Sequence, residues 1–169
     1  MNMKPKKLYH GNNTQIRGSL KPILKRDTVD HIHNKASVFA TARIDIAALF
    51  MFPMDTLASI GFEKDIAYIC IWGNKEEFKD NNGFIYILPS KPFIKFGKEY
   101  EWQSFEPVKP IEVKRFKSVI GGMINCGVQV YFINNDKIFD KIVSTKTRSS
   151  ILKRLISENQ KIKTNIKKF

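Results

Sequence analysis

Short runs of apolar residues alternate with polar turns along most of this chain, which is typical of β-strands. Such runs predict strands at 7–11, 37–41, 66–72, 84–88, 93–96, 99–105 and 128–133. Further segments predict helices at 46–51, 55–60, 113–124 and 134–145. Asp45 is the expected cap of the first helix, and Asn135 or Asp136 is the expected cap of the last. Many short strands with a few helices predict an α+β fold.

The last part of the chain, about 146–169, has apolar residues on one helical face and lysines on the other. Ile151, Leu155, Ile162 and Ile166 share the apolar face of this predicted amphipathic helix. Such a helix either docks on the core with a solvated basic face or contacts a nucleic acid or a partner. The nucleic-acid-binding candidates on it are Lys153, Arg154, Lys161 and Lys163.

A length of 169 residues with 43% hydrophobic residues predicts a single domain, with its core at about 7–133. The net charge is +13, and it is concentrated at the two ends. Residues 1–26 carry seven basic side chains and no acidic one, and residues 145–169 carry eight basic side chains and one acidic one. This asymmetry favours contact with a polyanion. Because Lys outnumbers Arg 23 to 6, a compositional bias remains the alternative.

Several classes of protein are not expected from this sequence. No apolar run is long enough to cross a membrane, and no apolar run follows the basic start as in a secretory signal. Cys70 and Cys126 are expected to be free thiols, so we expect a cytoplasmic protein. His31 and His33 lie on one side of an extended segment, but no third ligand has a standard spacing, so no metal is expected.

Three segments occur in an informative order. They are Leu8-Tyr9-His10-Gly11, then Val38-Phe39-Ala40-Thr41 followed by Ala47-Ala48, and then Glu99-Tyr100-Glu101-Trp102-Gln103-Ser104. In this order and spacing the chain resembles the ADP-ribosyltransferase fold in its His-Tyr-Glu branch, especially small bacterial and phage proteins with a Tyr-His-Gly strand. The likeness covers roughly residues 7–113 and implies two small packed antiparallel or mixed sheets with flanking helices.

The resemblance implies that NAD is the cofactor and that an unknown protein or nucleic acid is the acceptor. It places His10 on the nicotinamide-side ribose, with Gly11 allowing the dinucleotide to approach the backbone. It places Glu101 on the ribose 2′-hydroxyl, where a carboxylate stabilises the positive charge that develops as nicotinamide leaves. Phe39, together with Thr41 of the same strand, would line the nicotinamide site.

The sequence departs from the family pattern at two of these positions. Phe39 stands where the family has a stacking Tyr, and Ala47 stands where a Ser usually bonds the carboxamide. The alternative function is therefore a catalytically degraded module that binds a nucleic acid or protein through its basic surface. An NAD-consuming RNA 2′-phosphotransferase is a third hypothesis, for which Arg17 and Arg43 are the candidate phosphate contacts.

Overall fold

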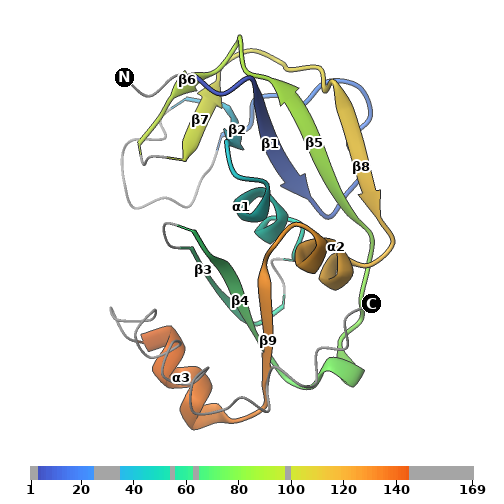
Figure 1. Ribbon diagram of the computed structural model, residues 1–169, viewed down its shortest axis with the longest axis vertical. Helices are drawn as coiled ribbons and strands as arrows, with labels where there is room; N and C mark the ends of the chain where they lie inside the picture. The colour runs from blue at the N-terminus through green and yellow to red at the C-terminus, as the bar shows by residue number, and fades with distance from the viewer. Residues whose placement is uncertain (1–3, 25–34, 54–55, 63–64, 98–99, 145–169) are drawn as a thin grey trace.

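The computed structural model describes residues 4–24, 35–53, 56–62, 65–97 and 100–144. Within these residues the chain forms two β-sheets, one of six strands and one of three strands. Helices α1 and α2 lie between the two sheets, and α3 lies against the far side of the small sheet (Figure 1). The predicted α+β class is confirmed.

The large sheet has the strand order β6-β7-β2-β1-β5-β8, and all of its neighbours pair antiparallel. Its strands are β1 (Lys7–Asn12), β2 (Val38–Thr41), β5 (Gly83–Pro89), β6 (Ile94–Lys95), β7 (Glu101–Ser104) and β8 (Glu112–Phe116). The small sheet contains β3 (Ala58–Phe62), β4 (Ala67–Trp72) and β9 (Gln129–Ile133), with β3 antiparallel and β9 parallel to β4. The helices are α1 (Ile44–Leu49), α2 (Val119–Asn125), α3 (Asp136–Ser144) and a short 3₁₀ helix, η2 (Lys75–Glu77).

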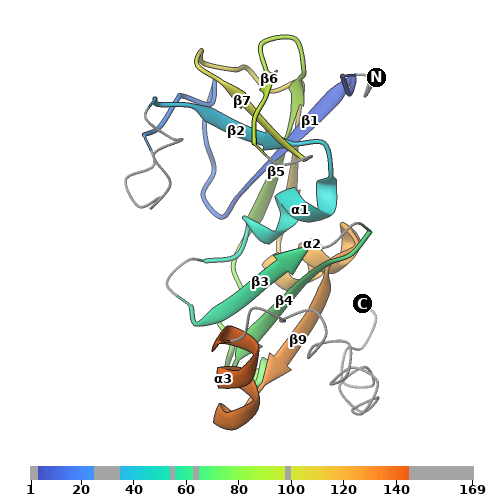
Figure 2. The ribbon, with the colours of Figure 1, turned by 90° about the vertical axis from the view of Figure 1, so that its left-hand side faces the viewer.

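The large sheet forks between β1 and β2. These two strands share the single register pair Tyr9↔Thr41, whereas β1 and β5 share six pairs and β2 and β7 share four. Figure 2 shows β2 and β7 crossing β1 obliquely. The sheet therefore consists of two well-paired halves, β6-β7-β2 and β1-β5-β8, that meet at one point.

The main core lies between the two sheets. Met51 after α1, Ile69 of β4, Ile85 of β5 and Met123 of α2 are all fully buried there. A second cluster covers the opposite face of the large sheet and includes Tyr86. Burial of this apolar surface, at roughly 25 cal/mol per Å², is the main force that holds the layers together.

Two predicted helices were wrong, because some of their residues form strands that pair with a neighbouring strand. The segment expected to be a helix at 55–60 instead contributes to β3, which pairs along its whole length with β4. Within the helix expected at 113–124, residues up to Phe116 belong to β8, which pairs with β5. Only the second half is helical, as α2, where Ser118 is the cap and accepts a hydrogen bond from the Gly121 amide at 2.7 Å.

The predicted caps were partly correct. Asn135 precedes α3, and its side-chain oxygen accepts a hydrogen bond from the Ile138 amide at 3.2 Å, as expected. Asp45 is not the cap of α1, because Arg43 takes that position and Asp45 lies in the first turn. Two other predictions, the basic C-terminal helix with its four candidate residues and the His31–His33 pair, lie outside the described residues.

Both cysteines are free thiols, as predicted, and Cys70 of β4 is fully buried. Burial raises the pKa of Cys70 from 9.0 to about 12, because the thiolate loses its hydration in the apolar interior. Above pH 9 the unfolded chain releases this proton while the folded chain keeps it, so deprotonation favours the unfolded state.

We therefore expect the free energy of unfolding to decrease between about pH 9 and pH 12, with Cys70 contributing at most about 1.4 kcal/mol per pH unit. The measurement is urea denaturation across this pH range for the wild type and for Cys70→Ala, which has no thiol to titrate. The stability difference between the two proteins should change with pH. A constant difference would contradict this assignment.

Candidate functional site

Strand pairing brings Phe39, Thr41 and Glu101 to one face of the large sheet. Thr41 lies opposite Glu101, and Phe39 lies opposite Gln103, in the antiparallel β2–β7 pair. Residues directly opposite each other in such a pair point to the same face, and diagonal neighbours are about 7–8 Å apart. Phe39 and Glu101 are such diagonal neighbours, so the aromatic ring and the carboxylate border the same patch of surface.

The connection between β6 and β7 passes close to the Glu101 carboxylate. The Phe96 amide donates a hydrogen bond to the Glu101 carbonyl at 2.9 Å. Gly97 follows with φ +56°, a left-handed conformation that favours glycine. A Cβ atom on Gly97 would lie 3.1 Å from Oε2 of Glu101, so the missing side chain leaves room beside the carboxylate.

Half-buried aromatic rings surround this position. Phe39 packs edge-on against Phe96, with ring centroids 5.9 Å apart, and Tyr100 packs edge-on against Phe62 of β3 at 6.4 Å. The Arg43 guanidinium lies 5.1 Å from the centroid of the Tyr100 ring. A carboxylate at the border of half-buried aromatic rings is suited to a flat, electron-poor or cationic ring.

Arg43 forms an ion pair with Asp45 at the start of α1. Its Nε lies 3.0 Å from Oδ1 and its Nη2 lies 2.5 Å from Oδ2 of that carboxylate. This hydrogen bonding raises the pKa of Arg43, outweighing the opposite effect of burial. Because Asp45 compensates its charge, Arg43 is poorly placed as the phosphate contact that a phosphotransferase would need.

His10 lies next to this patch but points to the other side of the sheet. It pairs with Tyr86 of β5, and its ring lies 6.2 Å from the Tyr86 ring, on the face opposite Gly11 and Tyr9. Its Nδ1 lies 2.7 Å from the Phe39 carbonyl oxygen across the fork. Since a carbonyl oxygen only accepts, Nδ1 carries a proton in this contact. The structure thus brings His10 to the backbone of Phe39, but not to the side chains of Phe39 and Glu101.

Gly11 and Ala47 have structural roles that the sequence analysis did not assign. A Cβ atom on Gly11 would lie 1.8 Å from the Ala47 carbonyl oxygen, so α1 packs directly on the bare backbone of β1. Ala47 is 1% exposed and belongs to the main core. Each of the two residues is covered by the other element, so the structure gives both a packing role, while the expected place of both in a cofactor site stays a prediction.

Thr41 is also buried, and its hydroxyl has a local partner. Oγ1 accepts a hydrogen bond from the Arg43 amide at 3.2 Å, which stabilises the turn from β2 into α1. Its contribution to the patch is therefore to position the helix start beside Glu101. The sequence analysis missed Tyr100 and Asp45 as members of this surface. The aromatic residue before Glu101 and the oppositely charged pair at Arg43 and Asp45 were the available signals.

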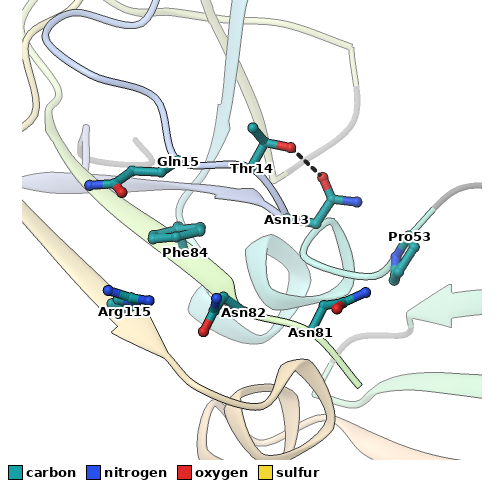
Figure 3. A pocket seen from close by; sticks show the side chains of 8 residues that line it. All are labelled: Asn13, Thr14, Gln15, Pro53, Asn81, Asn82, Phe84 and Arg115. Carbon is teal, nitrogen blue, oxygen red and sulfur yellow. Dashed lines mark hydrogen bonds between the residues drawn. The ribbon is translucent and has the colours of Figure 1, made fainter. Parts of the chain in front are cut away.

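A polar pocket lies elsewhere, at the other end of α1, between the loop after β1, the start of β5 and the end of β8 (Figure 3). Its volume is about 640 Å³, and its lining includes Asn13, Asn82 and Arg115. No sequence prediction pointed to it, because its residues come from separate turns and from two strands, β5 and β8.

A scan against protein-family models and searches of curated proteins and solved structures find no match to this chain. Within the described ranges, no three His, Cys, Asp or Glu side chains are grouped so that they could hold a metal ion. None of the helices in that part of the chain combines the length and apolarity that crossing a bilayer requires.

Proposed function

We propose that this chain is an NAD-dependent ADP-ribosyltransferase-like protein that transfers ADP-ribose to a protein or nucleic-acid acceptor. The observation that carries the proposal is the position of Glu101. Its carboxylate lies on the same face as the Phe39 ring, beside the fork of the large sheet. The order of the three sequence segments supports the same assignment.

Transfer of ADP-ribose from NAD to an acceptor requires few groups of the protein. The bond between the ribose C1′ and the nicotinamide nitrogen breaks, and its electron pair neutralises the positive charge of the ring. The ribose carbon becomes electron-deficient, and the negative charge of Glu101 stabilises it. An acceptor oxygen or nitrogen then bonds to C1′ and releases its proton to solvent. The Phe39 ring supplies a flat apolar surface for the departing nicotinamide.

His10 would act from the β1 side of the fork. The contact between Nδ1 and the Phe39 carbonyl orients the ring at the fork, and an imidazole is suited to hydrogen-bonding a ribose hydroxyl. Because its ring is on the Tyr86 side, the ribose would have to reach into the fork, between β1 and β2. We therefore assign His10 to binding and Glu101 to the charge-stabilising role.

The second candidate is a binding module without catalysis. Burial of Ala47 favours it, because the position that usually supplies a carboxamide hydrogen bond is an apolar core residue here. The absence of a hydroxyl on Phe39 removes a further polar contact. In this case the fold would still present its surface to a nucleic acid or protein but would not consume NAD.

We expect the purified chain to release nicotinamide from NAD faster than the spontaneous reaction, and to do so in the presence of a chelator. The measurement is chromatography of free nicotinamide, with NAD binding followed separately by calorimetry. NAD binding without nicotinamide release would favour the second candidate. If the chain neither bound NAD nor released nicotinamide, the proposal would be contradicted.

A further inference from the structure

The polar pocket is separated from the Glu101 face by the length of α1. Thr41, opposite Glu101, precedes the helix, whereas Pro53, which lines the pocket, follows it. Figure 3 shows Asn13 on one side of the pocket, with Asn82 and Arg115 on the other. The pocket is therefore a separate candidate site, and the inference below does not rest on the proposed function.

The pocket favours a negatively charged ligand. Among the described residues that line it, Arg115 is the one charged side chain and none is acidic. In the part of the chain that the structure describes, Arg115 is exposed and forms no ion pair. Asp80, adjacent to the lining residue Asn81, is already engaged, because it accepts hydrogen bonds from the Ser118 hydroxyl and from the Val119 amide. An uncompensated guanidinium is the preferred partner of a phosphate group.

The remaining lining residues favour a ligand that also carries a polar ring. Asn13, Gln15, Asn81 and Asn82 each present an amide group, which offers both donors and an acceptor. Amides of this kind match the mixed donor and acceptor edge of a nucleobase. Phe84 and Pro53 add apolar surface. The volume of about 640 Å³ lies within the usual range for small-molecule sites.

Strand pairing places Arg115 on the same face of the large sheet as the pocket residue Phe84. Arg115 of β8 lies opposite Phe84 of β5, so both point to the same face of the sheet. Its neighbour Lys114 lies opposite Ile85, whose side chain belongs to the core between the two sheets. Lys114 therefore has the same charge one residue away but points to the opposite face, which makes it a matched control.

We propose that this pocket binds a nucleoside monophosphate unit, with Arg115 on the phosphate and the side-chain amides on the base. The unit is supplied either as a free nucleotide or as part of a single-stranded nucleic acid, and the two sources present the same chemistry to the pocket. The side-chain amides distinguish the pocket from a site for inorganic phosphate alone, because phosphate has no nucleobase with which they could form hydrogen bonds.

The test is NMR titration of the full chain with AMP, with inorganic phosphate and with a short single-stranded oligonucleotide. We expect AMP to bind more tightly than phosphate and to shift the amide signals of Asn13 and Asn82. Arg115→Gln should weaken AMP binding about tenfold or more, and Lys114→Gln should change it less than twofold. Tighter binding of the oligonucleotide, with the same loss in Arg115→Gln, would identify a strand as the source.

Glu101→Gln separates this pocket from the proposed NAD site, because it should leave the AMP shifts at Asn82 unchanged. Thermal unfolding of each variant confirms that the fold is retained. If Arg115→Gln and Lys114→Gln reduced the affinity for AMP equally, the binding would reflect general attraction between charges, and the proposal would be overturned. Phosphate binding as tight as AMP binding, or shifts confined to the Glu101 face, would overturn it as well.

Discussion

Replacing Gly11 by alanine is expected to destabilise the protein by about 3 kcal/mol or more, because the new methyl group has no space. Its Cβ would lie 1.8 Å from the Ala47 carbonyl oxygen and 2.9 Å from the carbonyl carbon. Both atoms belong to the backbone of α1, so no side-chain rotation relieves the contact. The helix would have to move away from β1, opening the core around Met51. Urea denaturation measures the loss.

Gly18→Ala is the control for this change. Gly18 has φ +79°, and among the described residues no contact within 4 Å awaits a Cβ atom added there, so alanine costs only the strain of a left-handed conformation, about 1–2 kcal/mol. Equal stability losses in the two variants would show that α1 does not rest on β1 as described. If Gly11→Ala folded normally but no longer bound NAD, the role that the family resemblance gives to Gly11 would be supported.

Replacing Glu101 by glutamine is expected to reduce nicotinamide release on the order of 100-fold, the usual effect of losing a group that stabilises transition-state charge. The amide keeps the size of the side chain and removes its charge. No described residue pairs with the Glu101 carboxylate, so the free energy of unfolding should change little. Steady-state kinetics of nicotinamide release, with urea denaturation of the same preparations, measure both quantities.

Glu112→Gln is the matched control, since Glu112 is an exposed residue of β8 at the far edge of the same sheet. It should keep nicotinamide release within about twofold of the wild type, a change of less than 0.5 kcal/mol in barrier. If Glu101→Gln also released nicotinamide within about twofold of the wild-type rate, Glu101 would have no role in the reaction. A large loss of stability in Glu101→Gln would instead assign it a structural role.

Local patterns in the sequence predicted most strands but not the partners that decided two ambiguous segments. Runs such as 84–88 and 128–133 contain enough apolar residues to identify a strand without neighbours. The segments at 55–60 and 113–116 have mixed patterns, and they became strands because β4 and β5 each offered an edge to pair with. The apolar pattern within a segment does not show which other strand, adjacent in the sequence as β4 is to β3 or distant as β5 is to β8, will pair with it.

The same limit applies to the candidate site. The sequence order of the motifs placed Phe39, Thr41 and Glu101 on neighbouring strands, which the register brings together. It did not reveal that His10 points to the other face or that Ala47 covers Gly11, because both depend on how α1 and β5 pack against β1. The amide-rich pocket was also inaccessible to pattern analysis, because turns far apart in the sequence build it.

The strand order of the large sheet has a consequence for how the chain folds. β1 lies in the middle of this sheet, yet its main partner β5 follows much later in the sequence, after β2, α1 and the β3–β4 hairpin. The small sheet is completed in the same way, by β9. Ordering such long loops costs entropy before the distant strands meet, which places folding in the slow range of milliseconds to seconds. During synthesis, β1 therefore remains unpaired on the β5 side until the chain has been made as far as Pro89, about half of its 169 residues.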